Sequence, residues 1–175
     1  YAYRTSTKWY RYLFVDDSTP TCKSKPMLKK QLTEHTYDRW IEGGQLFGIS
    51  RYSFVLLSKD DVFIRDVISK HIKTIYFEMV TLCLLQRAYV IYFGNEIARI
   101  SKNIKHSEDN PSKNRNDISF LSEEYIRFVN RVYFREVTPQ EQGIELYDML
   151  QEHLRIESHT KKLELEFVEL SSTNS

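Results

Sequence analysis

Residues 118–170 read ISFLSEEYIRFVNRVYFREVTPQEQGIELYDMLQEHLRIESHTKKLELEFVEL, and this stretch decides the fold class. Two series of positions run through it, each with a spacing of seven residues, starting at Ile118 and Leu121, and most of their members are apolar. This spacing predicts a long helix that packs along one seam, either against a neighbouring subunit or against another helix of the chain. The seam residues of its C-terminal part are Leu146, Met149, His153, Ile156, Thr160, Leu163, Phe167 and Leu170.

The spacing is interrupted near residues 137–139. Thr138-Pro139-Gln140-Glu141 is a capping-box pattern with proline at the first helical position, which predicts a new helix or a sharp kink. Because the seam returns in phase, a kinked continuous rod is the favoured interpretation, and a chance agreement of phase is the alternative. We therefore expect residues 118–175 to form a return or stalk helix that is kinked near 137–139.

A second long helix precedes this one. The segment 60–103 contains no proline and only Gly94, which predicts a helix about 65 Å long at 1.5 Å per residue. Residues 104–117 are polar and include Pro111, which predicts a loop at the tip of an antiparallel hairpin. The return segment 118–170 is longer, about 80 Å if helical throughout, so it should protrude as a stalk.

The most apolar part of the first long helix, Ile75–Phe93, is about long enough to cross a bilayer. Glu78, Gln86 and Arg87 lie within it, and an ionised group at the centre of a bilayer is costly. We therefore expect this segment to be a helix that is buried on several sides in a soluble protein.

The first 58 residues predict a partial α/β head. Lys8–Val15 is rich in aromatic and β-branched residues and predicts a strand. Lys25–Glu42 predicts a helix that Gly43-Gly44 ends, and Phe47–Ser58 predicts a second strand. Because two strands alone form a marginal sheet, the sheet should be incomplete. The predicted class is α+β and predominantly helical, with this head and a long antiparallel helical hairpin.

Composition limits the class of protein. The 175 residues are 41% hydrophobic and 28% charged, which suits one domain with a buried core. The net charge of +1 argues against a nucleic-acid-binding protein that relies on bulk charge. Two cysteines cannot form a disulfide scaffold, so a reducing compartment fits best. The chain opens at Tyr1 rather than Met, and we expect it to be a piece of a longer protein.

The order of the predicted elements resembles the cytosolic half of the CorA-type divalent-cation transporter superfamily. The residues that carry the resemblance are Phe63–Ser101 and Tyr125–Leu170, and the second stretch resembles the stalk of an uncharacterised bacterial branch of CorA-like proteins. The resemblance implies that the Gly-Met-Asn signature of that family would lie beyond Ser175. The resemblance implies a head beside long helices, a ring of identical subunits (a pentamer in the family), and membrane attachment through segments beyond Ser175. It also implies regulatory metal sites built from carboxylates, although no position here matches such a motif.

The function that this resemblance implies is a non-enzymatic, cytoplasmic regulatory or structural domain of a CorA-like membrane protein, in Mg²⁺-type transport or its regulation. The alternative is a soluble helical adaptor or scaffold that binds a partner through the seam. The two differ in what should follow Ser175, which is two closely spaced apolar helices for the first and none for the second. A hydrolase with its site in a missing N-terminal part is a third possibility.

Carboxylates are the candidate metal ligands. Asp16 and Asp17 follow a predicted strand, where open sheets often carry ligands, although turn chemistry explains Asp-Asp-Ser-Thr-Pro equally well. The segment 136–170 is acidic and could gather Mg²⁺ or another divalent cation, or it could be a solvated helix face. A thermal melt with added Mg²⁺ distinguishes these two interpretations, because a cation sensor requires a shift of the melting temperature at millimolar Mg²⁺.

Other residues are weaker candidates for a functional site. His153 and Glu157 have the spacing of a transition-metal pair on a helix, but His153 also lies on the seam, where a polar residue fixes register. Cys83 lies in an apolar helix and Cys22 in a loop, and no HExxH, CxxC or GxSxG pattern occurs, so the sequence predicts no catalytic site and no enzyme. The aromatic and basic run 8–12 could stack on single-stranded nucleic acid, but a half-buried strand is the better explanation.

Overall fold

The structure is a computed structural model that describes residues 1–106 and 111–172. The chain divides into two compact units, and each is described on its own. Unit 1 contains Tyr1–Val80 and Pro139–Leu154, and unit 2 contains Thr81–Thr138 and Arg155–Ser175. The chain is 71% helical and has one small antiparallel sheet of three strands, which confirms the predicted α+β, predominantly helical class.

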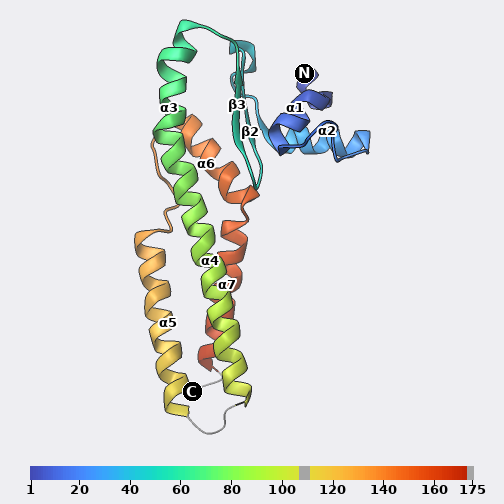
Figure 1. Ribbon diagram of the computed structural model, residues 1–175. Helices are drawn as coiled ribbons and strands as arrows, with labels where there is room; N and C mark the ends of the chain where they lie inside the picture. Colours follow the sequence, from blue (N-terminus) through green and yellow to red (C-terminus); the bar gives the residue numbers. More distant parts are fainter. Residues whose placement is uncertain (107–110, 173–175) are drawn as a thin grey trace. The chain divides into compact units, whose positions relative to one another are not determined.

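Unit 1 is built from short helices and the sheet, whose strand order is β1-β2-β3 (Figure 1). α1 packs on β3, and α6 packs on β2. Its elements are η1 (Ala2–Thr5), α1 (Thr7–Phe14), α2 (Lys25–Glu34), β1 (Thr36–Tyr37), η2 (Ile41–Gly43), β2 (Gln45–Ile49), β3 (Phe54–Ser58), η3 (Ile64–Ile68), α3 (Ser69–Lys73), the start of α4 (Ile75–His106) and α6 (Glu141–His153).

The segment predicted as the first strand, Lys8–Val15, is helix α1, so that prediction is wrong. Ser6 is the N-cap of this helix, because its hydroxyl accepts a hydrogen bond from the N–H of Trp9 at 3.2 Å. Trp9, Tyr10 and Leu13 lie on one face of the helix and are buried. Bulky aromatic side chains favour strands, but at this spacing they also cover one side of a helix, and tertiary burial selects the helix.

The segment predicted as the second strand, Phe47–Ser58, is a hairpin of β2 and β3 rather than one strand. The N–H of Ser50 donates to the carbonyl of Ser53 at 2.9 Å and closes the turn. The helix predicted over Lys25–Glu42 ends at Glu34, and β1 follows it. The missing third strand is therefore supplied by part of the predicted helix, which pairs with the far side of β2.

Gly48 explains how α1 lies directly on the sheet. A Cβ atom at this position would lie 2.8 Å from Cγ of Leu13 and 2.9 Å from Cγ2 of Val55. A side chain there would push α1 away from β2, so the glycine permits a close approach of helix and strand.

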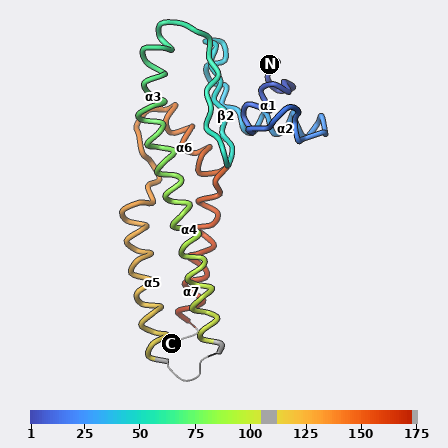
Figure 2. The backbone as a smooth tube through the Cα atoms, in the orientation of Figure 1, coloured from blue at the N-terminus to red at the C-terminus, as the bar shows by residue number. Residues whose placement is uncertain are grey.

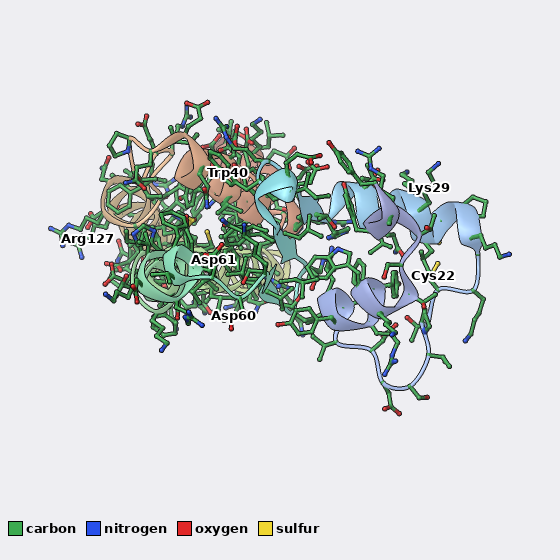
Figure 3. All side chains as sticks on the ribbon, turned by 90° about the horizontal axis from the view of Figure 1, so that it is seen from above. Cys22, Lys29, Trp40, Asp60, Asp61 and Arg127 are labelled. Carbon is green, nitrogen blue, oxygen red and sulfur yellow. The ribbon has the colours of Figure 1, made fainter. Side chains whose placement is uncertain are left out.

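The predicted helix 60–103 is present but interrupted. Asp60 and Asp61 lie at its start, as expected for acids at a helix N-terminus, and Oδ1 of Asp61 accepts from the N–H of Ile64 at 2.9 Å (Figure 3). A π-helical turn, η3, leads into α3, which ends at Thr74, a residue with φ −122° and ψ −90°. α4 then continues to His106. A helix buried on several sides was expected over 75–93, but only 28% of the most apolar window of Ile64–Ile104 is buried, so that expectation is wrong.

Unit 2 is a bundle of three helices: the greater part of α4, α5 (Pro111–Arg131) and α7 (Ile156–Ser172). Figure 2 shows α5 running in the opposite direction to α4 and α7. Gln86 of α4 is fully buried, and its amide donates to the carbonyl of Val132, just beyond the end of α5, at 2.8 Å. The shared core consists of Val90, Phe93, Ile97, Ile100, Ile118, Leu121, Phe128, Leu163, Phe167 and Leu170.

The return segment differs from the predicted rod. The kink expected near 137–139 is a complete break, because α5 ends at Arg131 and α6 begins at Glu141. A second break, which the sequence did not reveal, lies at Leu154–Arg155, where Arg155 has a left-handed φ of 56°. In unit 2, α7 packs on α4 and α5 and does not protrude as a stalk. Helix also replaces much of the predicted tip loop 104–117, of which residues 107–110 lie outside the described part of the chain, as do residues 173–175 of the predicted stalk.

Candidate functional site

A polar cluster in unit 1 joins the first strand to α6. The hydroxyl of Tyr37 donates to Oε2 of Glu145, and Nη1 of Arg39 donates to Oε1 of the same carboxylate at 2.6 Å. Burial and the neighbouring carboxylate raise the pKa of Tyr37, while the hydrogen bonds from Tyr37 and Arg39 lower the pKa of Glu145. Tyr37 therefore stays protonated and Glu145 stays ionised at neutral pH, an arrangement that ties α6 to the segment around β1.

A second polar link lies at the start of α6. Nε1 of Trp40 donates to the side-chain oxygen of Gln142, whose amide nitrogen donates to the hydroxyl of Tyr76, both at 2.7 Å. Gln142 thus bridges the loop after β1 and the first turn of α4 within unit 1. Figure 3 labels Trp40, which follows β1 in the chain. The side-chain oxygen and the side-chain nitrogen of Gln142 each have a hydrogen-bond partner in the protein, so this link contributes to the structure of unit 1.

A pocket of about 450 Å³ lies beside the polar cluster. Its acids are Asp38, Glu145 and Asp148, of which Asp38 accepts a hydrogen bond from the hydroxyl of Tyr3 at 2.8 Å. Glu145 is already neutralised by Arg39 at 2.6 Å. Within residues 1–106 and 111–172, no three His, Cys, Asp or Glu side chains converge as a metal site requires.

A pair of histidines lies at the other end of α6. The rings of His35 and His153 are stacked, with centroids 3.9 Å apart and planes inclined by 17°. Nδ1 of His35 contacts the carbonyl of Ile49 at 2.6 Å, and Nε2 of His153 contacts the carbonyl of Glu34 at 3.2 Å. The two rings thus connect the last residue of α6 to α2 and to the end of β2.

An exposed apolar face lies on α4 in unit 2, and we call it the α4 face. Its members are spaced so that all lie on one side of the helix, and none of them is charged. The exposed fractions of the large side chains are between 45% and 50%. An uncharged apolar face of this kind on a helix is a candidate interaction surface. The α4 face consists of Leu84, Leu85, Ala88, Ile91 and Tyr92.

A groove of about 670 Å³ runs between α4 and α7 in unit 2. α4 lines it with small and apolar residues, including Gly94 and Ala98, and α7 contributes Lys162, Glu166 and Glu169. Nζ of Lys162 lies 3.3 Å from Oε1 of Glu166, so this cation and anion neutralise each other. The groove therefore combines a largely apolar side from α4 with one basic and two acidic side chains from α7.

The premise of the predicted carboxylate site, that it follows a strand, is wrong. Asp16 and Asp17 follow a helix rather than a strand, and Oδ2 of Asp16 accepts from the N–H and the hydroxyl of Thr21 at 2.7 and 2.9 Å. The carbonyl of Asp17 accepts from Nε of Arg11 at 2.5 Å. The turn chemistry that was the alternative therefore explains these residues better.

The predicted His153–Glu157 pair is not on one helix, because α6 ends at His153 and α7 begins at Ile156. Glu157 pairs instead with Lys161 at 2.6 Å. Cys22, which Figure 3 labels, lies in the connection between α1 and α2, and Cys83 is fully buried in α4.

Most of the seam residues are packed inside the chain. Leu146, Ile156, Thr160, Leu163, Phe167 and Leu170 are buried, while Met149 and His153 are half-buried. The hydroxyl of Thr160 donates to the carbonyl of Ile156 at 2.9 Å, so this polar seam residue is satisfied within its own helix. In the part of the seam on α7, the partner is the chain's own bundle.

Sequence reasoning missed the contacts of α6, because their partners lie far away in the sequence. Tyr37 and Glu145 are 108 residues apart, and His153 lies 119 residues from Glu34. No local motif marks such pairs. The α4 face was visible as an apolar helix, but its exposure could not be read from the pattern.

No family model, curated protein or solved structure matches this chain.

Proposed function

We propose that this chain is a non-enzymatic assembly domain of a CorA-like membrane protein involved in Mg²⁺-type transport or its regulation. The segments that resemble this family, Phe63–Ser101 and Tyr125–Leu170, supply most of α4, the end of α5, and both α6 and α7. The observation that carries the proposal is the α4 face, an uncharged apolar surface within the first of these segments. Identical neighbours in a ring would cover it.

The energetics favour a covered α4 face. Burying a large apolar side chain that was fully exposed contributes about 1.5–3 kcal/mol, and the four large members of the face are about half exposed. A contact that removes them from water therefore contributes several kcal/mol before the entropy of association is subtracted. This supports weak self-association of the isolated chain, which further contacts in a whole assembly would strengthen.

The proposal includes no cation-dependent step. Within residues 1–106 and 111–172 no three potential ligands converge, and the carboxylate of Glu145 is paired with Arg39, so the proposal assigns no residue to a metal. Mg²⁺ enters here only as the cargo of the proposed parent protein.

A soluble helical adaptor is the second candidate, and the α4 face favours it as well. An amphipathic helix of another protein binds an apolar helical surface through anchors at positions i, i+4 and i+7. The adaptor hypothesis first placed its contact on the seam, but α7 uses that seam inside the bundle. The partner would therefore bind α4 and leave α7 in place.

Light scattering coupled to gel filtration tests the assembly proposal. The wild-type chain should form oligomers as its concentration rises towards about 1 mM, where even a contact with a Kd of 1 mM is substantially populated. Leu84→Glu with Ile91→Glu should leave a folded monomer, because two buried, unpaired carboxylates are costly.

The matched control is Ile126→Glu on α5, since this isoleucine is also exposed, at 58%. It should leave the association unchanged. A wild-type chain that remains monomeric throughout this range, or a double variant that associates as the wild type does, would refute the assembly role. A wild-type monomer that nevertheless binds a helical peptide through the α4 face would support the adaptor.

A further inference from the structure

The histidine pair of unit 1 suggests a response to acid. Each contacted ring nitrogen must donate, because a backbone carbonyl only accepts. His35 therefore carries a proton on Nδ1 and His153 carries one on Nε2. With both rings neutral, the stack holds the last turn of α6 on α2 and β2. Protonation of both rings would place two positive charges in stacked rings 3.9 Å apart.

The surroundings of the pair supply little compensation. From α1, Phe14 meets the ring of His35 edge-on, with centroids 5.0 Å apart, and offers no charge. From β2, only the carbonyl of Ile49 faces the pair. The acids that act on His153 are Glu34 of α2 and Glu152 of α6, and both are on the exposed side of their helices. Burial of His153, followed by the charge of His35, outweighs these acids and lowers the pKa of His153 below its ordinary value of 6.5.

We propose that the stacked imidazoles of His35 and His153 form an acid-sensitive latch, which holds the C-terminal end of α6 on α2 and β2 at neutral pH and releases it in acid. This inference does not depend on the assembly role, because it rests on contacts within unit 1 alone. The latch lies at the end of α6, immediately before the helix break at Leu154–Arg155. Its release frees the last turn of α6 without breaking the Tyr37–Glu145 link near the start of that helix.

The sign of the effect follows from linkage. The open form binds a proton on His153 at the ordinary pKa of 6.5, whereas the closed form binds it only at lower pH. Closure is therefore fully favoured above 6.5 and weakens as the pH falls from there to the lowered pKa. Each unit by which the pKa is lowered multiplies the ratio of open to closed forms about tenfold.

Hydrogen exchange of the last turn of α6 tests the latch. The N–H of Leu154 donates to the carbonyl of Leu150 at 2.9 Å and reports directly on this turn. Its protection factor, which is already corrected for the intrinsic effect of pH, should fall between about pH 7.5 and about pH 5, by about tenfold for each unit by which closure lowers the pKa of His153. His153→Phe keeps an aromatic ring in the stack but cannot be protonated, so its protection should be the same at both pH values.

The matched control is His159→Gln, which removes an exposed histidine from α7 and should keep the wild-type fall in protection. A wild-type protection factor that does not change with pH would overturn the latch, and so would a His153→Phe variant that loses protection in acid as the wild type does. His35→Phe provides a second measurement, because it should raise the pKa of His153 in an NMR titration by removing the neighbouring charge. An unchanged titration of His153 in that variant would show that the two rings are not coupled.

Discussion

The two units are stabilised in different ways. Unit 1 has its own apolar core, which includes Trp9, Leu13 and Leu32. Polar pairs also join segments of this unit that are distant in the sequence, such as Tyr37 with Glu145 and Trp40 with Gln142. Unit 2 is joined by a cluster of apolar and aromatic side chains, in which the ring of Phe93 meets those of Tyr125, Phe128 and Phe167. Apolar contacts tolerate many neighbours, whereas each polar pair requires one partner in one geometry. Unit 2 should therefore be sensitive to lost volume, and unit 1 to lost hydrogen bonds.

The largest expected effect is on the core of unit 2. Phe93→Ala removes a ring that is 1% exposed and should lower the free energy of unfolding by about 3–5 kcal/mol. Far-UV circular dichroism in urea measures this loss. Phe120→Ala on α5, where the ring is 63% exposed, is the control and should change stability little. Equal losses in the two variants would contradict the bundle core described here.

The next effect is on the polar cluster of unit 1. Tyr37→Phe removes the hydrogen bond to the Glu145 carboxylate and should cost about 1.5–3 kcal/mol, the range for a bond to a charged group. Both tryptophans, Trp9 and Trp40, belong to unit 1, so tryptophan fluorescence in urea follows this unit separately from the bundle.

Acid should weaken the same cluster. Because the folded-state pKa of Glu145 is lowered from 4.5, its contribution is complete above 4.5 and is lost as the pH falls through the lowered value. Glu145→Gln should remove this part of the pH dependence, with Arg127→Gln, an exposed change on α5, as the control (Figure 3). A Tyr37→Phe protein as stable as the wild type, with an unchanged acid profile in Glu145→Gln, would mean that the cluster does not stabilise unit 1.

The smallest expected effect is a gain. Val15 ends α1 in the left-handed region, with φ 56° and ψ 39°, and is 69% exposed. A β-branched side chain is strained there, whereas glycine is not, so Val15→Gly should raise the stability of unit 1 by about 0.5–1 kcal/mol. Val15→Ala should recover less than the glycine variant. Thermal melts followed by tryptophan fluorescence rank the three proteins, and a destabilised glycine variant would show that the valine side chain contributes packing that outweighs the strain.

The difference between the units also explains which predictions succeeded. In the bundle, the spacing of apolar residues identified the buried side of α7, because helical periodicity and burial coincide there. The scarcity of proline and glycine identified α4, but not which of its sides is exposed. In unit 1 the same reasoning failed at α1, where Trp9, Tyr10 and Leu13 satisfy strand propensity and also cover one side of a helix. It also treated α6 and α7 as one rod, since the heptad phase continues across Leu154–Arg155 although the backbone does not. The heptad phase shows only which side chains are apolar. It does not show whether the helix between them is continuous.

The candidate sites also differ in whether the sequence could reveal them. The carboxylates that the sequence suggested, Asp16 and Asp17, are used in a turn. The polar cluster and the histidine pair depend on partners more than a hundred residues away in the chain, for which a single sequence contains no signal. The adaptor hypothesis now places the partner on α4 rather than on α7. Only the packing of the helices shows which apolar side is left uncovered.

The amino-acid sequence alone determined the helical class and the approximate position of the long helices, and it indicated an interruption near 137–139, because periodicity, proline and glycine act on neighbouring residues. The tertiary structure decided that residues 7–14 form a helix, that α6 belongs to unit 1 and α7 to unit 2, and which histidines and carboxylates meet. Those outcomes depend on contacts between segments distant in the chain, where burial and the pairing of polar groups outweigh the local preferences of each segment.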